Sequence, residues 1–466
     1  MRAIRPLMLS GKEVLPLIEG GKGISISDGL SCGAWARAGG VGTFSGANAS
    51  DYDEEGRVIP YVYQSKTRRE RHRELVELSV RGAIAQARKA YDIAGGHGRI
   101  HMNILWEMGA AEEVLRKTLE GARGLIHGVT CGAGMPYRLA EICAQFGVFY
   151  YPIISSARAF SALWRRAYHK FRDMLGAVVY EDPWLAGGHN GLSNKEDYDK
   201  PEPPLPRVVA LRQMMNGFGL HETPIVMAGG VWYLREWEEW LDNPQLAPMA
   251  FQFGTRPLLT KESPISDAWK ASLFKLNKGD VLLHRFSPTG FYSSAVRNQF
   301  IRDLEERSKR QIPYRRHREE AFDTALAIGT RKRNVYVRQC DMPSIQAWHK
   351  EGQSEALRTP ESTLVFVTPE KADTIHRDQV ACMGCLSACL FSNWSQDASG
   401  TTGRKVDPRS FCIQKTLQTI IHQGDDIDNE LVFAGHGAYR FAYDPFYKNG
   451  FIPTVQQLVE RILTGD

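Results

Sequence analysis

The chain has 466 residues, of which 43% are hydrophobic and 24% are charged. This balance is that of an ordinary globular protein, and it excludes a disordered chain, a fibrous repeat and a small disulfide-rich fold. The 58 basic and 53 acidic residues leave a net charge of only +5, so the composition does not indicate a nucleic-acid-binding protein. The sequence shows no secretory signal at its start and no apolar run of the ~18 residues that a membrane-spanning helix needs. We therefore expect a cytoplasmic protein without membrane contact.

Short apolar runs alternate with longer amphipathic segments over the first two-thirds of the chain. Helices are predicted between the apolar runs, and the alternation itself predicts a parallel sheet covered by helices. The predicted strands are residues 100–105, 124–129, 149–154, 176–180, 224–228 and 250–253. We expect an α/β fold, a TIM (β/α)8 barrel over residues 1–330, since such a barrel takes ~250 residues and carries its site at the carboxyl ends of its strands.

Two stretches interrupt or follow this alternation. Residues 44–75 end in the run KTRRERHRE, which predicts a solvated loop and helix face, with contact to RNA or an acidic partner as the alternative. The composition changes near the basic residues 331–333, and the chain ends in an amphipathic helix at residues 454–463. We therefore expect a second region, residues 331–466, that carries a cysteine cluster and packs on the barrel.

Glycine-rich segments lie near the N-terminus and at the ends of several predicted strands. GGKGISIS begins at Gly20 and GVTCGAGMP at Gly128, while PIVMAGGV begins at Pro224 and FQFGTR at Phe251. Glycine lets the backbone approach a ligand closely, and backbone N–H groups bind phosphate. The last two turns, one strand–helix unit apart, indicate the phosphate site that α/β barrels place after their final strands. Ordinary turn glycines are the alternative.

Two polar side chains lie where a barrel would present them to a ligand. His189 lies in the turn AGGHNG after the strand at 176–180, and histidine can act as acid, base or hydrogen-bond donor near neutral pH. Asn103 lies in the strand at 100–105, where its amide could reach a ligand. A structural histidine, and an amide that only satisfies neighbouring backbone, are the alternatives.

Three of the eight cysteines are crowded together in the spacing C-x2-C-x3-C. Cys382, Cys385 and Cys389 could bind one face of an iron–sulfur cube, with Cys412 as the fourth ligand from further along the chain. The spacing therefore predicts a [4Fe-4S] cluster. Zinc, which favours a second C-x2-C pair, and thiols that are free or redox-regulatory are the alternatives.

Taken in order, these segments resemble the nitronate monooxygenase family, also called the 2-nitropropane dioxygenase family. These are FMN-dependent α/β-barrel enzymes, and they include flavin-type enoyl-acyl-carrier-protein reductases. The resemblance is carried by GGKGISIS, AGGVGT, MNILW, GVTCGAGMP, AGGHNG, PIVMAGGV and FQFGTRPLLTKES, and it leaves the charged insert at 44–75 unmatched. The cysteine run is similar to the cluster-binding segment of iron–sulfur flavoproteins of the dienoyl-CoA reductase type, which bind [4Fe-4S] beside an FMN barrel.

The resemblance implies an FMN site with His189 as the catalytic residue over the flavin. The residues that would bind FMN are Gly21, Lys22, Gly23, Asn103, Gly187, Gly188, Gly229, Gly230, Gln252, Gly254 and Thr255. Of these, the phosphate would be held by Gly229, Gly230, Gly254 and Thr255. Lys22 stands where many members carry methionine, and a cation there would stabilise the anionic reduced flavin, unless the side chain points to solvent.

Two functions follow from the resemblance. The first is oxidation of a small nitronate or related anion by FMN, with oxygen completing turnover. The alternative is an iron–sulfur flavoprotein reductase that passes hydride from FMN to an activated C=C bond of the enoyl-thioester type, with NAD(P)H or an electron carrier as donor. The cysteine cluster favours the alternative, because a simple monooxygenase needs no one-electron relay. A nucleic-acid partner is not expected, and a homo-oligomer is compatible with the sequence, which does not identify the substrate.

Overall fold

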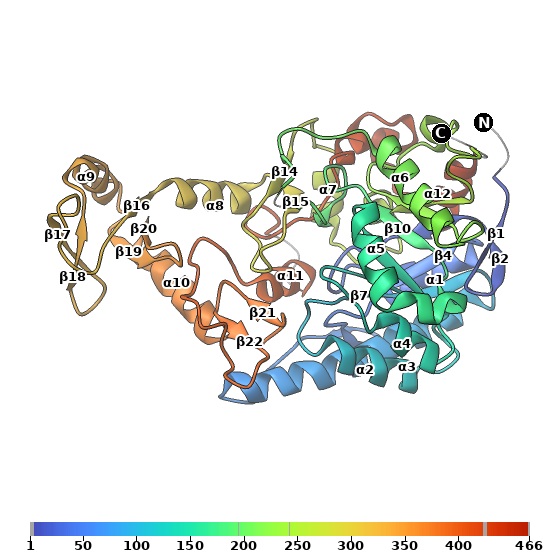
Figure 1. Cartoon of the computed structure of the whole chain (residues 1–466), viewed down its shortest axis with the longest axis horizontal. Helices are drawn as coiled ribbons and strands as arrows, with labels where there is room; N and C mark the ends of the chain where they lie inside the picture. The colour runs from blue at the N-terminus through green and yellow to red at the C-terminus, as the bar shows by residue number, and fades with distance from the viewer. Residues whose placement is uncertain (1–3, 194, 242, 423–425, 465–466) are drawn as a thin grey trace.

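The computed structural model describes residues 4–193, 195–241, 243–422 and 426–464. Eight parallel strands form a closed barrel in the spatial order β10-β12-β13-β3-β4-β7-β8-β9. These strands are β3 (Leu17–Glu19), β4 (Val41–Ser45), β7 (Arg99–Leu105), β8 (Gly128–Gly132), β9 (Phe149–Ile154), β10 (Val178–Glu181), β12 (Ile225–Ala228) and β13 (Met249–Phe253). The barrel lies in the right half of the molecule in Figure 1, where β4, β7 and β10 are labelled. The predicted TIM barrel is confirmed.

Five of the six predicted strands match barrel strands to within two residues at each end. The strand predicted at 124–129 instead lies at Gly128–Gly132, because Gly124 adopts a φ of +81° in the turn that precedes it. The first two barrel strands, Leu17–Glu19 and Val41–Ser45, were not among the predicted ones. They are short, buried at every position and flanked by glycines, so they lack the polar alternation that marks a strand in a sequence.

The interior of the barrel is filled at its amino end. Ile18, Val179 and Val226 form a small apolar cluster inside the barrel, separate from the larger core between strands and helices. An N-terminal hairpin, β1 (Leu7–Leu9) and β2 (Lys12–Val14), adds side chains to this inner cluster. The carboxyl ends of the strands are therefore the open end of the barrel.

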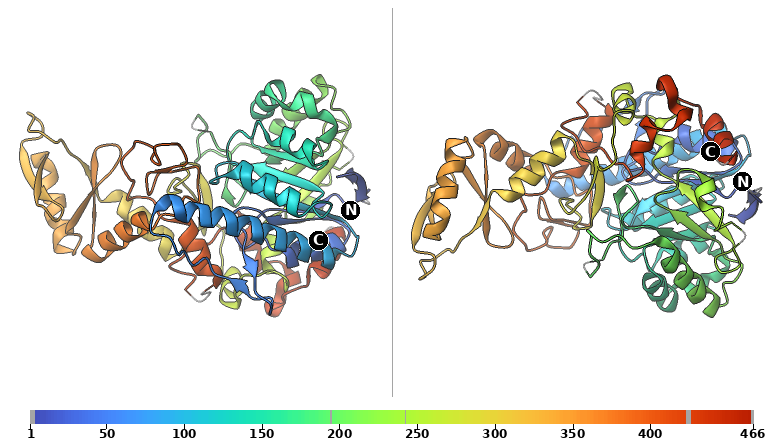
Figure 2. Two further views of the ribbon diagram at one scale, coloured as in Figure 1. Left: turned by 90° about the horizontal axis from the view of Figure 1, so that it is seen from below. Right: turned by 90° about the horizontal axis from the view of Figure 1, so that it is seen from above.

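Helical segments cover the outside of the barrel. They are α1 (Gly29–Arg37), α2 (Arg68–Ala94), α3 (Ala111–Gly121), α4 (Leu139–Gln145), α5 (Ala157–Arg166), η1 (Tyr168–Met174), α6 (Pro204–Gly217) and η2 (Leu234–Trp237). The last helix of the chain, α12 (Val455–Leu463), contacts α1 and buries an apolar stripe in the barrel core. The chain thus leaves the barrel after β13 and returns with α12, so both ends of the chain lie beside the barrel (Figure 2).

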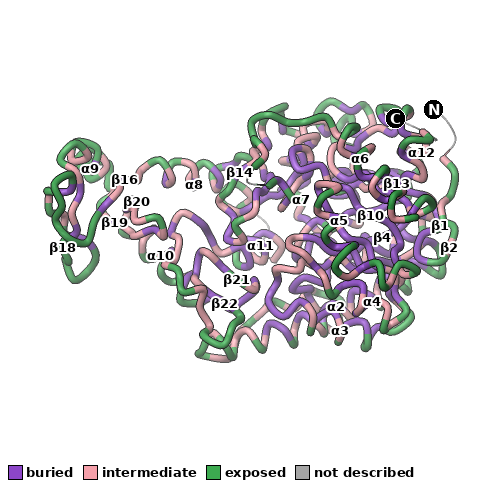
Figure 3. The backbone as a smooth tube through the Cα atoms, in the orientation of Figure 1, coloured by how far each residue is buried: buried purple, intermediate pink, exposed green. Residues whose placement is uncertain are grey.

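Residues 311–367, which we call the arm, project from the barrel and have a hydrophobic core of their own (Figure 1, left). The arm consists of β16 (Gln311–Pro313), β17 (Thr324–Ile328), β18 (Arg333–Val337), η4 (Gln339–Asp341), α9 (Met342–Lys350), β19 (Glu355–Arg358) and β20 (Thr363–Val367). Helix α8 (Gln299–Lys309) leads into the arm and α10 (Pro369–Val380) leads out of it. Buried positions are concentrated in the barrel, whereas much of the arm is exposed (Figure 3). Residue 330 lies in the turn between β17 and β18, and the division of the chain there stays a prediction.

The remaining elements lie between the barrel strands or between the barrel and the arm. They are β5 (Asp51–Tyr52), β6 (Val58–Ile59), β11 (Gly188–His189), η3 (Arg256–Leu259), α7 (Asp267–Leu273), β14 (Val281–His284), β15 (Ser293–Val296), β21 (Ala388–Cys389), β22 (Trp394–Ser395), α11 (Ile413–His422), η5 (Ala438–Ala442) and η6 (Pro445–Gly450). None of the helices in the described part of the chain combines the length and the apolar character that crossing a membrane requires.

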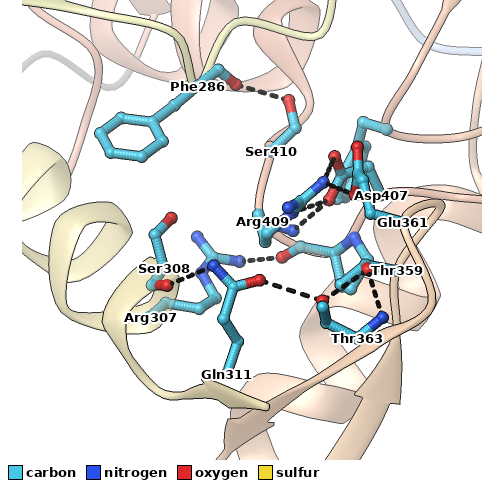
Figure 4. A network of polar contacts seen from close by, with 12 residues as sticks. Phe286, Arg307, Ser308, Gln311, Thr359, Glu361, Thr363, Asp407, Arg409 and Ser410 are labelled. Carbon is cyan, nitrogen blue, oxygen red and sulfur yellow. Dashed lines mark hydrogen bonds and ion pairs between the residues drawn. The ribbon is translucent and has the colours of Figure 1, made fainter. Parts of the chain in front are cut away.

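A polar network fixes the base of the arm (Figure 4). The buried Arg307 of α8 donates a hydrogen bond of 2.8 Å to the carbonyl oxygen of Pro408. Burial lowers the pKa of this guanidinium to about 10. Arg409 forms an ion pair of 2.8 Å with Asp407 and a second ion pair with Glu361 of the arm. Because buried and half-buried arginines hold this segment, noncovalent contacts join the arm to residues 407–409 in addition to the covalent chain.

Candidate active site

A cavity of about 360 Å³ opens at the carboxyl ends of the barrel strands. Residues at or just after the end of every one of the eight strands line it. This is where α/β barrels build their sites. The predicted site residues that line the cavity are Gly21, Lys22, Gly23, Asn103, Gly187, Gly188, His189, Gly229, Gly230, Gln252, Gly254 and Thr255. The structure therefore brings together every residue that the sequence singled out for the flavin and the catalytic step.

Two glycines after β3 make room for amide side chains. A Cβ atom on Gly21 would lie 1.7 Å from Nδ2 of Asn103, and one on Gly20 would lie 3.0 Å from Nε2 of Gln252. Oδ1 of Asn103 is buried and has no hydrogen-bond partner among the described residues. A buried polar atom without a partner costs free energy unless a ligand satisfies it. The amide therefore fits the polar edge of a flavin ring.

The turns after β12 and β13 offer backbone to an anion. Gly229 and Gly230 have φ angles of +89° and +76°, which only glycine adopts readily. A Cβ atom on Gly254 would meet nothing within 4 Å, so this glycine borders open cavity space. The hydroxyl of Thr255 accepts a hydrogen bond of 3.0 Å from the N–H of Gly435. The two positive φ angles and the open space beside Gly254 fit a phosphate group. Thr255 in addition connects the C-terminal segment to this wall of the cavity.

The cation of Lys22 is neutralised by a carboxylate. Its ammonium forms a buried ion pair with Glu19 at the end of β3, and the hydroxyl of Ser31 donates to the same carboxylate. The side chain of Lys22 is 3% exposed and that of Glu19 is fully buried. The alternative of a Lys22 side chain in solvent is therefore wrong. Stabilisation of the anionic reduced flavin by this cation stays a prediction, and the carboxylate of Glu19 offsets part of its charge.

His189 is half-buried beside the cavity. Strand β11, which contains it, pairs with β15, and its Nε2 lies 2.6 Å from the hydroxyl oxygen of Ser287. The ring of Phe433 packs edge-on against it, with the ring centroids 5.7 Å apart. Burial lowers the pKa of His189 to about 4. The imidazole is therefore neutral at pH 7 and can accept a proton or donate a hydrogen bond.

Glu181 is a second titratable group that lines the cavity, and sequence reasoning missed it. It is the last residue of β10, directly before the turn that leads to His189. Burial, and to a smaller extent the neighbouring Asp182, raise the pKa of its carboxyl to about 8. At pH 7 the carboxyl is therefore mostly protonated. Its place at the carboxyl end of a predicted strand was the signal that could have found it.

The C-terminal segment closes one side of the cavity. Phe433, Ala434 and Gly435 line it, although they follow the barrel strands by about 180 residues. A Cβ atom on Gly187 would lie 2.6 Å from backbone atoms of Ala434 and Gly435, so the segment packs directly on the AGGH turn. No strand pattern in the sequence could have placed this segment, because the contact is made between two loops.

The four predicted metal ligands lie in one region, next to the loop that follows β7. Cys382, Cys385 and Cys389 are buried, and Cys412 is half-buried. Burial raises the pKa of the Cys385 thiol far above its usual range, and the thiols of Cys412, Cys389 and Cys382 raise it further. Among residues 4–193, 195–241, 243–422 and 426–464, however, no three His, Cys, Asp or Glu side chains are arranged to hold a metal ion. The [4Fe-4S] prediction is therefore not confirmed.

The basic run at the start of α2 holds the cysteine segment in place. Arg68 donates to the carbonyl oxygens of Gln379 and Ser392 at 2.5 and 3.1 Å. Arg71 donates to those of Val380 and Cys382 at 2.8 and 3.2 Å. The run therefore begins a helix, as predicted, but two of its arginines bind backbone rather than solvent.

Comparison with known proteins agrees with this geometry. FabK from Thermotoga maritima has a similar structure, with a TM-score of 0.51 and 15% identity over 97% of this chain and 92% of that chain. Nitroalkane oxidase from Streptomyces ansochromogenes gives a TM-score of 0.53 with 13% identity, over 99% of this chain and 96% of that chain. No match to a curated protein sequence was found. At these identities the structural likeness shows the shared fold.

A sequence profile adds the family. The profile described as nitronate monooxygenase matches residues 111–465, which is most of the chain. The match includes the AGGH turn, the two glycine-rich turns after β12 and β13, and the C-terminal segment. The chain is therefore an FMN-dependent oxidoreductase that belongs to the nitronate monooxygenase family.

Proposed function

We propose that the chain oxidises a small nitronate or a related anion with FMN held in the barrel cavity. The observation that carries the proposal is the neutral, half-buried His189 beside a glycine-walled cavity with an unsatisfied amide, Asn103. When bound, FMN supplies the acceptor for the electrons of the substrate and the donor for oxygen. The chain would supply the wall that orients both ligands, and it would exclude water from them with Phe433 and its neighbours.

His189 would act on the substrate through its second ring nitrogen. Its Nε2 is held by Ser287, whose oxygen also lies 2.8 Å from the hydroxyl of Thr289. Among the described residues, none forms a hydrogen bond with Nδ1 of His189, so Nδ1 is available to a ligand. A neutral imidazole can donate to the oxygen of a nitro group or accept a proton from the substrate carbon. Because Ser287 already holds the ring, less free energy is needed to orient the imidazole in the transition state.

Glu181 is expected to give the reaction a pH dependence near its raised pKa. Below pH 8 the carboxyl is protonated and neutral, and above pH 8 it becomes an anion inside the cavity. An anionic substrate is then repelled, so kcat/KM should fall as the pH rises through about 8. In Glu181→Gln, which stays neutral, this fall should disappear, and kcat/KM profiles of both proteins measure it. A fall near pH 8 that persists in the variant would assign the titration to another group.

Turnover with a defined substrate tests the proposed function. We expect oxygen consumption with propyl-2-nitronate that depends on added FMN and on neither NADH nor NADPH. The alternative reductase would instead consume NAD(P)H in the presence of an enoyl thioester, and it would not consume oxygen with the nitronate. Assaying both reactions with one preparation decides between the two, because each predicts activity where the other predicts none.

The alternative reductase is favoured by the cysteine region. The N–H of Gly109 donates a hydrogen bond of 3.0 Å to the carbonyl oxygen of Cys385. The N–H of Ser387 donates one of 2.7 Å to the carbonyl oxygen of Glu107. The cysteine segment is therefore bound to the loop that follows β7, two residues beyond the cavity-lining Leu105. Cys382, Cys385, Cys389 and Cys412 are the residues that would hold a [4Fe-4S] cluster, and such a group would supply the one-electron chemistry of the reductase alternative.

Iron and sulfide analysis of anaerobically purified protein tests the cluster. The reductase alternative predicts about four irons per chain, the content of a cubane held by four cysteine thiolates, whereas the nitronate reaction requires none. Cys385→Ser should lose the iron, whereas Cys340→Ser should retain it, because Cys340 is exposed in the arm and lies outside the cysteine region. Protein that contains flavin but neither iron nor sulfide would contradict the cluster, and the nitronate reaction would then stand alone.

A further inference from the structure

A second cavity, of about 440 Å³, lies between the arm and α10. Its walls come from the turn between β17 and β18, from β19, from α10 and from residues 406–408. The wall at Pro408 is fixed by the hydrogen bond from the buried Arg307 (Figure 4). This volume lies within the range of ~300–1,000 Å³ that small-molecule sites occupy. Neither the flavin nor the proposed reaction uses it.

The charges around this cavity are of one sign. Arg331, Arg333 and Arg358 line it, and no aspartate or glutamate among the described residues does. Nε of Arg358 is buried and has no hydrogen-bond partner among the described residues. A buried donor of a charged group is costly to leave unsatisfied, so a bound oxyanion would stabilise it.

Nearby carboxylates are engaged elsewhere and do not neutralise these side chains. On α10, Asp373 pairs with Arg377 at 3.0 Å and Asp378 pairs with Lys415 at 2.6 Å. At the base of the arm, Asp407 pairs with Arg409 at 2.8 Å. The cavity therefore keeps a net positive charge.

The floor of the cavity is apolar. Ile328, Ala356 and Ile375 line it and are 8%, 9% and 5% exposed. An apolar floor under a cationic rim matches a ligand that has an apolar body and an anionic end group. We propose that this cleft binds an amphipathic anion, a small molecule that carries a phosphate or a carboxylate on an apolar body.

Calorimetric titration of the flavin-loaded full chain with decyl phosphate tests the proposal. We expect binding that is at least tenfold tighter than that of inorganic phosphate or 1-decanol, since each probe supplies only one half of the recognised chemistry. Arg358→Gln and Arg333→Gln should each weaken decyl phosphate binding by about tenfold, the scale of one charge-assisted hydrogen bond. Decanoate in place of decyl phosphate distinguishes a carboxylate from a phosphate end group.

Arg377→Gln is the matched control, because Arg377 lies on α10, which forms one wall of the cleft, but pairs with Asp373 outside the cleft. It should bind decyl phosphate as the unaltered chain does. Arg333 is exposed, so its variant tests the cleft even where substitution of Arg358 perturbs folding. Absence of binding, binding that both cleft variants leave unchanged, or equal binding of 1-decanol or inorganic phosphate would each overturn the proposal.

Discussion

Replacement of His189 by alanine is expected to lower kcat for nitronate oxidation by roughly 10²–10⁴-fold, the usual contribution of a positioned acid or base. The imidazole is neutral, half-buried and held at 2.6 Å by Ser287, so it is prepared for proton transfer or hydrogen bonding without reorganisation. FMN binding should persist, because the glycine-rich turns that we propose for the FMN phosphate follow β12 and β13. Steady-state kinetics and the flavin content of the purified variant measure the two effects.

The pH dependence identifies the group that acts. Because the pKa of His189 is lowered to about 4, its base form is present at all higher pH and is lost only as the pH falls through about 4. This acid limb should be absent in the alanine variant. His221→Ala is the control, since His221 is exposed in a turn and lies outside the cavity. A His189→Ala variant with unaltered kcat would show that the reaction does not use this imidazole.

Replacement of Gly254 by alanine is expected to weaken FMN binding at least tenfold, which is about 1.4 kcal/mol. The added methyl group would meet no protein atom within 4 Å, so it should leave the flavin-free fold intact and occupy only cavity space. The melting temperature of the flavin-free protein should therefore not fall, while the Kd for FMN rises. Fluorescence titration of FMN and thermal unfolding measure the two quantities.

Two further glycines calibrate this result. Gly217→Ala adds the same methyl group at the end of α6, also without a neighbour within 4 Å but far from the cavity lining, and should not change FMN affinity. Gly21→Ala should weaken FMN by a different route, because its methyl would displace the Asn103 amide. If Gly254→Ala bound FMN as tightly as the unaltered chain, the assignment of this turn to the phosphate would be wrong.

The sequence predicted the barrel and most of its site because these depend on local patterns. The alternation of apolar runs with amphipathic segments predicted five of the barrel strands, and the glycine-rich turns indicated the wall of the cavity. The parts that it could not predict depend on contacts between distant segments. Ser287 contacts His189 because β11 pairs with β15, and Phe433 contacts it from the C-terminal segment. Helix α12 packs on the barrel about 200 residues after the last barrel strand ends. The pairing of Lys22 with Glu19 was likewise invisible, because the strand that ends at Glu19 was not predicted.

Anaerobic mixing of the FMN-loaded protein with propyl-2-nitronate tests the central claim most directly. The account predicts that the nitronate alone bleaches the visible absorption of the oxidised flavin, and that admission of air restores it. The His189→Ala protein should bleach at least a hundredfold more slowly. A flavin that stays oxidised with the nitronate but is reduced by NAD(P)H would contradict nitronate oxidation and support the enoyl reductase instead.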